Sequence, residues 1–440
     1  MKKRMKKGFR RRLLAVLATG SLCTAAFCGC AGGEEVKQTN DSLKLCVDKF
    51  INETYQAGFE QFKEEYPDVQ LDVEVYEDLM TGMQRVNTQI MAGEGPDLLI
   101  LPCYGNTDVY KMMRAGAFAP MDEFLKEDSA WNAQDYVKAA LDAGIYDGKQ
   151  MVMPLSYNVQ TAVTSQQNLE QAGISLDSCA DMLSFMQEMA GFYETDGITQ
   201  TLGDQGKLGI FPTYLSKSFL NYKDATLGVE EQMLKQACEA YKNFYEEDSS
   251  VNLPPGAAWE VGEKIAAGDI GMYLTTGPSD FMKASQAVAA NAQPVLWPFK
   301  NADGAVSANI MEYAGIRANS GNRQNAWNLL KILMGENTQR EVCKAGLYSP
   351  VLKSVLEEGI DTAREDAFQR GQKITEMAKL SDDLMQQYKE AVMEPSHAVF
   401  VTDISNQKFM EYMRPFYEGE SSYEDCFASF KKFTDVYLSE

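Results

Sequence analysis

Polar and aromatic residues follow predicted strands in loops that a hydrophobic core alone does not require. Asp48 comes directly after the apolar segment 43–47, and Tyr104 and Asn106 follow the continuous apolar run "LLIL" at 98–101. An aromatic ring can stack on an apolar ligand face, while a carboxylate and an amide hydrogen-bond to hydroxyl groups. These loops therefore indicate binding of a small polar molecule.

Catalytic chemistry has little support in the sequence. His397 is the only histidine, which argues against Ser-His-Asp, Cys-His and multi-histidine metal sites. The cysteines after Cys30 are scattered without a Cys-x-x-Cys motif, as is typical of small buried side chains. A pair of carboxylates for glycoside hydrolysis can be imagined among 63 acidic residues, but no spacing singles one out. We expect no catalytic residue, metal or cofactor.

The elements that position the first loops alternate between strand and helix. Residues 43–47, 69–76 and 98–101 have strand patterns, and two helical patterns with apolar residues every three to four positions lie between them, over 52–66 and 79–92. The cluster Gly-Glu-Gly-Pro-Asp then ends the second helix and precedes the third strand. This order predicts a doubly wound α/β sheet, in which ligands bind outside the carboxyl ends of the strands.

Two of the loop residues also have a purely structural interpretation. Asn106 or Thr107 equally suits the N-cap of a helix that includes Val109 and Met113.

Further along, a strand over 270–274 leads into "TTGPSDF". Here Thr276 and Gly277 precede a helix whose first backbone N–H groups are available to a ligand.

The N-terminus has the features of an export signal. Residues 2–12 carry eight basic and no acidic side chains, and an apolar stretch follows from Leu13 to Phe27. This pattern is typical of a secretion signal and is short for a transmembrane helix. The segment then reads Cys28-Gly29-Cys30 and resembles a bacterial lipobox, in which a cysteine receives the lipid.

The lipobox resemblance implies a division of the N-terminal region. Cys30 fits the lipidated position best, and Cys28 is the alternative. We expect a signal peptide over 1–29 and a flexible tether over 30–42, rich in Gly, Glu, Asn, Thr and Ser. The anchored protein would then face outward from the bacterial cytoplasmic membrane, or into the periplasm where an outer membrane exists.

The charge of the mature chain disfavours one class of partner. Residues 1–29 hold eight of the 41 basic residues and none of the 63 acidic ones, so their removal leaves a net charge near −30. Such a surface repels phosphate backbones, which disfavours nucleic-acid binding. The 440 residues are too many for one core and suggest about two to three domains.

The order of these signals resembles the extracytoplasmic solute-binding proteins of ABC importers with maltose-binding-type topology. The resemblance covers nearly all of 43–440 and is carried by "GEGPDLLIL", "AAGDIGMYLTTGP", "YDGKQMVMPLSYNVQT" and "NRQNAWNLLKILMG". It implies the two-lobe type II periplasmic-binding-protein fold, in which each lobe is a doubly wound sheet flanked by helices and crossing hinge strands join the lobes. Hinges near Pro154, Pro294 and Pro350 would give lobe 1 (43–153 and 294–347) and lobe 2 (154–293 and 348–440).

The resemblance also implies a cleft between the lobes that closes on ligand. Position and residue chemistry give its candidate ligand-binding residues: Asp48, Tyr104, Asn106, Tyr157, Asn158, Thr276, Gly277, Trp297, Tyr313 and Tyr348. For each aromatic residue, packing in a core or between the lobes is an equal alternative.

The implied function is capture of a sugar or oligosaccharide by a lipid-anchored monomer that delivers it to the transmembrane subunits of an ABC permease. A peptide or polyamine is the alternative ligand. An anchored sensor or accessory receptor with the same fold, and an exported carbohydrate-active enzyme, are the alternative classes of protein.

Overall fold

The computed structural model describes residues 42–103, 108–197, 200–203, 210–215, 219–246, 257–275, 277–366 and 380–439. The strand–helix alternation predicted for its first part is confirmed. Helix α1 follows β1 directly because Asp48 caps it and its apolar residues recur every three to four positions, which buries one face of the helix. The elements of this part are β1 (Ser42–Asp48), α1 (Lys49–Glu65), β2 (Gln70–Tyr76), α2 (Leu79–Met91) and β3 (Leu98–Pro102).

The first sheet has five strands and combines β3 with segments from much later in the chain. β1 and β2 form a separate parallel pair that lies beside β3, where the N–H of Asp97, just before β3, donates to the carbonyl of Lys44 in β1. The long strand β13 (Ser307–Ile316) runs antiparallel to β3 and, on its other side, to β6 (Met153–Asn158). Two short strands complete the sheet: β14 (Ser349–Pro350) beside β6, and β15 (His397–Phe400) parallel to the first half of β13.

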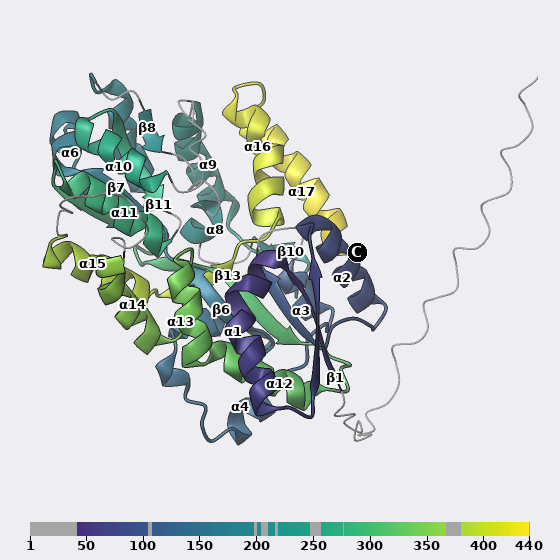
Figure 1. Ribbon diagram of the computed structural model, residues 1–440. Coiled ribbons are helices and arrows are strands. Elements are labelled where there is room, and N and C mark those ends of the chain that lie inside the picture. The colour runs from purple at the N-terminus through teal and green to yellow at the C-terminus, as the bar shows by residue number, and fades with distance from the viewer. Residues whose placement is uncertain are drawn as a thin grey trace, which may run out of the picture. The chain divides into compact units, whose positions relative to one another are not determined.

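Helices of widely separated sequence cover the first sheet. Helix α1 packs against α12 (Arg323–Met334) and α13 (Glu336–Ala345), and Figure 1 shows these helices together. Helix α14 follows and packs on α13. The other elements of this part are α3 (Val109–Arg114), α4 (Asp122–Glu127), α5 (Lys138–Ala143), the hairpin β4 (Ile145–Tyr146) and β5 (Lys149–Gln150), and α14 (Lys353–Asp366).

The second sheet has the strand order β12-β7-β11-β8, in which β7 is antiparallel to both neighbours and β11 is parallel to β8. Its strands are β7 (Thr161–Ser165), β8 (Gln200–Gly203), β11 (Ile270–Thr275) and β12 (Pro294–Pro298). Helices α10 and α11 pack on one face, and Val163 and Tyr273 of the sheet belong to the same group of buried residues as these helices. The bounds of these two helices are Ala258–Ala267 and Pro278–Ala289.

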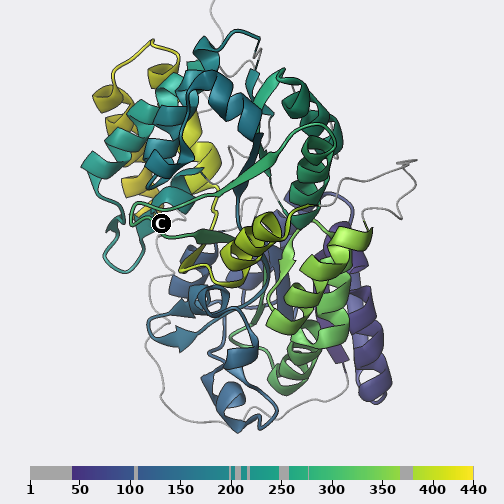
Figure 2. The same ribbon diagram turned by 90° about the vertical axis from the view of Figure 1, so that its left-hand side faces the viewer.

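The opposite face of the second sheet carries a separate hydrophobic core, which joins Met272 and Trp297 to α7, α9, α16 and α17. Figure 2 shows the yellow helices α16 and α17 beside the teal helices of this part. The remaining elements are α6 (Gln166–Ala172), α7 (Met182–Met189), α8 (Ile210–Leu215), β9 (Leu220–Asn221), β10 (Thr226–Leu227), α9 (Glu231–Glu246), α15 (Asp382–Met393), α16 (Phe409–Tyr417) and α17 (Tyr423–Ser439). Short 3₁₀ turns span Ala133–Asp135, Leu176–Ser178 and Ala190–Glu194, and a π-helical turn spans Ile404–Lys408.

The chain passes between the two sheets in three segments. It leaves the first sheet after β6 through residues 159–160 and returns through 299–306 between β12 and β13. After β15 it passes through 401–403 to the helices of the second core. Pro154 and Pro350 lie within strands of the first sheet, and Pro294 opens a strand of the second. The predicted lobe boundaries remain a prediction.

Candidate functional site

Asp48 lies where the sequence places it, at the carboxyl end of β1. Its side chain is buried, and one carboxylate oxygen accepts the N–H of Ile51 at 2.7 Å, which caps α1. Burial raises the pKa of Asp48, and the hydrogen bonds from the helix N–H groups oppose this rise. The residue therefore has a structural role as an N-cap at the same edge of the sheet where a ligand is expected.

A second buried acid, which is not among the predicted ligand-binding residues, lies beside this edge. Glu312 of β13 is fully buried, and its Oε2 accepts hydrogen bonds from the Tyr55 hydroxyl at 2.7 Å and the Ser156 hydroxyl at 2.6 Å. Burial raises the pKa of Glu312 to about 7; the two hydroxyl donors oppose the rise, and the negative charge of Asp48 adds to it. Oε1 has no hydrogen-bond partner among the described residues.

The backbone around Glu312 is irregular. The pairing of β13 with β6 shifts register on both sides of this residue, between Ile310 and Tyr313. Such bulges bend strands and redirect side chains. One signal in the sequence marks the residue: it is the only acid in the otherwise apolar and neutral stretch "NIMEYAGI".

Aromatic and backbone groups surround the same edge. The rings of Phe50 and Tyr348 meet edge-on, with centroids 6.2 Å apart. Gly277 caps α11 from the second sheet, and a Cβ at this position would lie 2.0 Å from the carbonyl oxygen of Leu347. The adjacent N–H of Ser279 donates to the carbonyl of Gly346 at 3.1 Å. The structure thus brings Asp48, Tyr348 and Gly277 to one region, where elements of both sheets meet.

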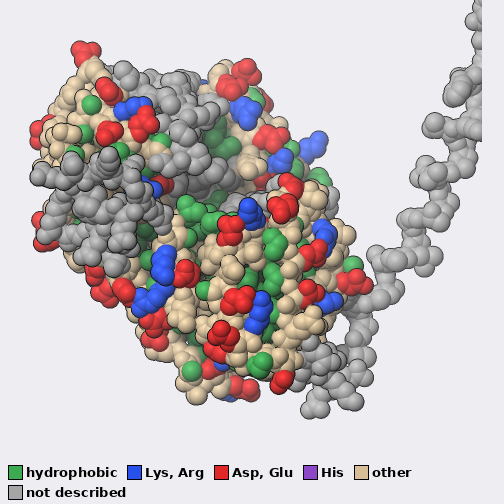
Figure 3. Space-filling view, viewed as in Figure 1, with side chains coloured by type: hydrophobic (Ala, Val, Ile, Leu, Met, Phe, Trp, Pro, Cys, Tyr) green, Lys and Arg blue, Asp and Glu red, His purple; other side chains and the backbone are tan. Residues whose placement is uncertain are grey.

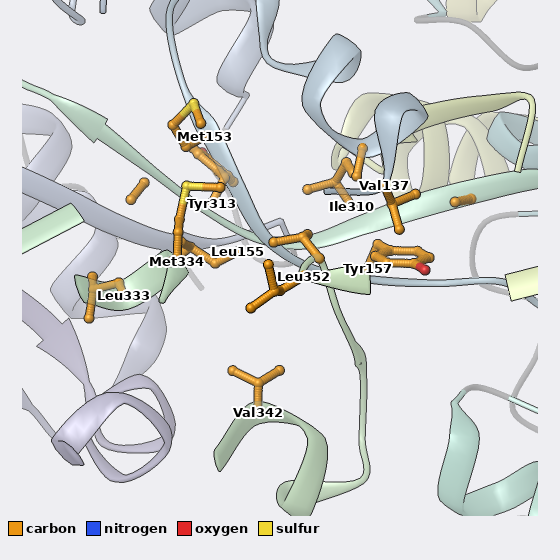
Figure 4. Close-up of a cluster of buried hydrophobic side chains, with 14 of the residues drawn as sticks. Val137, Met153, Leu155, Tyr157, Ile310, Tyr313, Leu333, Met334, Val342 and Leu352 are labelled. Carbon is orange, nitrogen blue, oxygen red and sulfur yellow. The ribbon is translucent and has the colours of Figure 1, made fainter. Parts of the chain in front are cut away.

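Two of the predicted ligand-binding tyrosines are part of the core. Tyr157 is fully buried and donates its hydroxyl to the carbonyl of Val392 at 2.5 Å, and the ring of Tyr313 meets Phe400 edge-on at 5.2 Å. Figure 4 shows both rings among aliphatic side chains, including Leu155 and Leu352. Both tyrosines therefore pack in the core, which is the equal alternative to ligand binding.

Trp297 and Asn158 are also buried. The Trp297 ring stacks on Phe185 of α7 with centroids 4.0 Å apart, so one of its faces is covered inside the second core. Asn158 ends β6 opposite Asn309 of β13, at the point where the chain leaves the first sheet. Asn158 therefore lies beside the crossing segment, whereas Trp297 lies in the second hydrophobic core, on the face of the second sheet that α7 covers.

Several predicted residues lie outside the described residues: Tyr104, Asn106, Thr276 and the lipidation candidate Cys30. The N-cap of the helix after the first of these is described. Asp108 caps α3 by accepting the N–H groups of Tyr110 and Lys111 at 3.1 and 3.2 Å. The suggested capping role of Asn106 or Thr107 was therefore wrong, because the next carboxylate in the chain has the extended backbone and the spacing that a cap needs.

A cavity of about 660 Å³ opens at the other end of the first sheet, lined by residues that include Lys44, Asp72, Gly95, Asp97, Arg317 and Asn322. Its buried carboxylate, Asp97, accepts the N–H of Lys44 at 3.0 Å, the Ser320 hydroxyl at 2.7 Å and the Asn322 amide at 3.1 Å. Arg317 pairs with Asp97 at 3.3 Å. These groups satisfy one another and fix the turn before β3, where Gly93 and Gly95 have positive φ angles of 76° and 107°.

The surface charges, the cysteines and the possible metal ligands complete the description of the described residues. Acidic side chains are spread over the face shown in Figure 3, with basic ones between them. The six cysteines of the described part of the chain are unpaired. Within the same residues, no cluster of three or more His, Cys, Asp or Glu could hold a metal ion, and no helix is both long and apolar enough to span a membrane.

One comparison with known proteins identifies a family. The family model for bacterial extracellular solute-binding proteins matches residues 57–375. A search of curated proteins gave no match. The sugar-binding protein MalE from Xanthomonas citri aligns with 90% of this chain and 97% of its own, at 14% identity and a TM-score of 0.67.

Two further solved structures have similar coverage. An ABC substrate-binding protein from Listeria monocytogenes in complex with cycloalternan covers 90% of this chain and 99% of its own, at 16% identity and a TM-score of 0.59. A solute-binding protein from Streptococcus pneumoniae in complex with the blood group A-trisaccharide covers 91% and 100%, at 16% identity and 0.57. At these identities the likeness shows the fold, and the predicted type II binding-protein fold is confirmed.

Proposed function

The chain belongs to the bacterial extracellular solute-binding proteins, and from this premise we propose that it captures a sugar or oligosaccharide for an ABC importer. The observation that carries the proposal is the region where Asp48, the Phe50–Tyr348 ring pair and the N-terminus of α11 meet. Carboxylate, aromatic edge and backbone N–H groups are the partners that hydroxyl-rich rings use. Complexes of similar folds with cycloalternan and a trisaccharide support the ligand class.

Capture works by closure of two lobes. The predicted lobes are 43–153 with 294–347 and 154–293 with 348–440. The proposed hinge is formed by the crossing segments 159–160, 299–306 and 401–403, because β6, β14 and β15 pair within the first sheet and β12 pairs within the second. Each lobe is rigid because its sheet is covered by helices, so ligand contacts from both lobes form together only when the lobes approach. A ligand that contacts both lobes shifts the population toward the closed form by its differential affinity.

The mature protein is tethered outside the cytoplasmic membrane. A lipid on Cys30 would anchor it through the segment 30–42, and the transmembrane subunits of the permease would receive the closed, monomeric protein. Replacement of Cys30 by serine is expected to release the protein from membranes. Lipid labelling that persists in this variant would instead assign the anchor to Cys28.

The ligand class is tested by thermal unfolding of the mature chain in the presence of mono- and oligosaccharides, peptides and polyamines. Binding to the folded state alone raises the midpoint with the logarithm of ligand concentration above Kd. We expect at least one saccharide to do so and to be recovered unchanged. Stabilisation by peptides or polyamines alone would refute the sugar assignment, and recovery of an altered saccharide would indicate an enzyme.

A further inference from the structure

Three buried acids of the first part of the fold differ in how their carboxylate oxygens are occupied. Asp97 pairs with Arg317, and both oxygens of Asp108 accept hydrogen bonds, Oδ1 from two backbone N–H groups and Oδ2 from two tyrosine hydroxyls. Glu312 is fully buried, but its Oε1 has no hydrogen-bond partner among the described residues. A buried oxygen without a partner is costly, so this position requires an explanation beyond the stability of the fold.

Glu312 lies where a ligand is expected, at the carboxyl end of β3. It pairs with Pro102, the last residue of β3, and Asp48 is the last residue of the neighbouring strand β1. The Tyr55 hydroxyl donates to Glu312. Burial raises the pKa of Tyr55, and the charges of Glu312 and Tyr348 add to the rise, so this hydroxyl lies near both side chains. Tyr55 therefore connects the buried acid to the half-buried ring of Tyr348.

No cation of the described residues compensates these two acids. Neither Asp48 nor Glu312 forms an ion pair with a described lysine or arginine, and no such residue shifts the pKa of either. The N-terminus of α1 balances part of the charge of Asp48, which caps it. The other titratable groups that face Glu312 are the Tyr55 hydroxyl and the Cys103 thiol. Both are neutral near pH 7, because burial raises their pKa values, that of Cys103 to about 12.

We propose that the captured saccharide carries a protonated amine, which Asp48 and Glu312 select by their negative charge. This inference rests on the proposed capture of a saccharide and specifies its class. An ammonium group supplies the positive charge that the two acids lack and donates charge-assisted hydrogen bonds. The half-buried rings of Phe50 and Tyr348 lie in the same region, and aromatic rings attract cations.

Such binding releases a proton from the protein. Glu312 holds a proton below about pH 7, and a nearby ammonium group favours the carboxylate form, so Glu312 loses this proton when the ligand binds. Between about pH 5 and about pH 6.5 an amine remains protonated. Affinity for the amine should therefore rise with pH in this window, by at most about tenfold per unit. A neutral saccharide leaves the proton on Glu312.

Titration calorimetry of the mature wild-type chain tests the inference. The probes are glucosamine and galactosamine, as monomers and short oligomers, each against its N-acetylated counterpart, because acetylation removes the charge and keeps the ring. We expect the amine forms to bind at least about tenfold more tightly, as a charge pair shielded from water does. Titrations at about pH 6 in two buffers of different ionisation enthalpy count the protons, and we expect release of up to one per ligand.

The outcomes separate this inference from the proposed function. Equal binding of the amine and acetylated forms, or binding of the amine without proton release, would overturn the inference. Binding of a neutral saccharide and of none of the amines would also overturn it, while the proposed capture would stand. If no saccharide of either kind binds, the proposed function fails as well.

Variants assign the effect to Glu312. Glu312→Gln keeps the size of the side chain and removes its charge, so proton release should vanish and the preference for the amine should fall at least about threefold. Glu64→Gln, at an exposed position of α1, should behave as the wild type does. If Glu312→Gln fails to fold, Asp48→Asn, which keeps an oxygen to cap α1, should also reduce the preference. An unchanged preference in the folded variant would overturn the assigned role.

Discussion

Asp97 and Glu312 are both buried acids of the first sheet, but they meet different donors. Asp97, at the amino end of β3, accepts from a backbone N–H, a hydroxyl and an amide and pairs with Arg317. Glu312, toward the carboxyl end, accepts from two hydroxyls and has no ion pair with a described lysine or arginine. From this difference we infer that Asp97 stabilises the fold at the amino end of the strands. Glu312, toward their carboxyl ends, has a pKa raised to about 7.

The largest loss of stability is expected at the amino end of β3, where Asp97 accepts several hydrogen bonds and pairs with Arg317. Asp97→Ala removes the partner of a nearly buried arginine and leaves the donors of Ser320 and Asn322 without their acceptor. We expect a loss of about 3–5 kcal/mol in the free energy of unfolding, measured with denaturant. Asp72→Asn, an exposed acid of the same cavity, is the matched control and should cost less than about 0.5 kcal/mol. Equal losses of unfolding free energy in the two variants would contradict the stabilising role of Asp97.

The next effect concerns pH. The folded-state pKa of Glu312 is raised from its ordinary 4.5 to about 7, so the folded protein holds a proton that the unfolded chain releases. The proton on Glu312 therefore stabilises the folded state. This stabilisation is fully present below the pKa of the carboxyl in the unfolded chain and is lost as pH rises from about 4.5 to about 7, for a total of about 3 kcal/mol.

Glu312→Gln should remove this decline, as followed by unfolding at several pH values between 4 and 8. Glu64→Gln, at an exposed position of α1, keeps the wild-type profile as the control. Parallel profiles for the wild type and Glu312→Gln would show that the carboxyl does not titrate in this window.

The smallest effect sharpens the comparison by removing one donor. The Ser156 hydroxyl lowers the pKa of Glu312, so Ser156→Ala should move the titration midpoint of this carboxyl above about 7. Infrared absorption of the protonated carboxyl at varied pH measures that midpoint. We expect a stability change of about 1 kcal/mol, as for a single hydrogen bond. A midpoint that stays fixed or falls would contradict the assigned donor.

The sequence was sufficient for the early elements, because their periodicity is local. The predicted strands and helices between residues 43 and 101 match β1 to β3 with small differences at their ends.

The site was less predictable because it depends on long-range pairing. Tyr313 pairs with Leu101 in β3, and Glu312 bonds to Tyr55, 257 positions earlier in the chain. Nothing local distinguishes Tyr348, half-buried beside Phe50, from Trp297, which stacks inside the second core. The aromatic residues that remain accessible are set by the arrangement of the sheets and helices.

The central claim is that a saccharide binds where Asp48, Tyr348 and Gly277 meet. Titration calorimetry of the mature chain with the saccharide that most raises its unfolding midpoint tests this most directly, with Tyr348→Ala in parallel. We predict one site per chain and about tenfold or weaker affinity in the variant, because a stacking ring is lost while the fold is kept. Equal affinities for the wild type and a folded variant would contradict the claim.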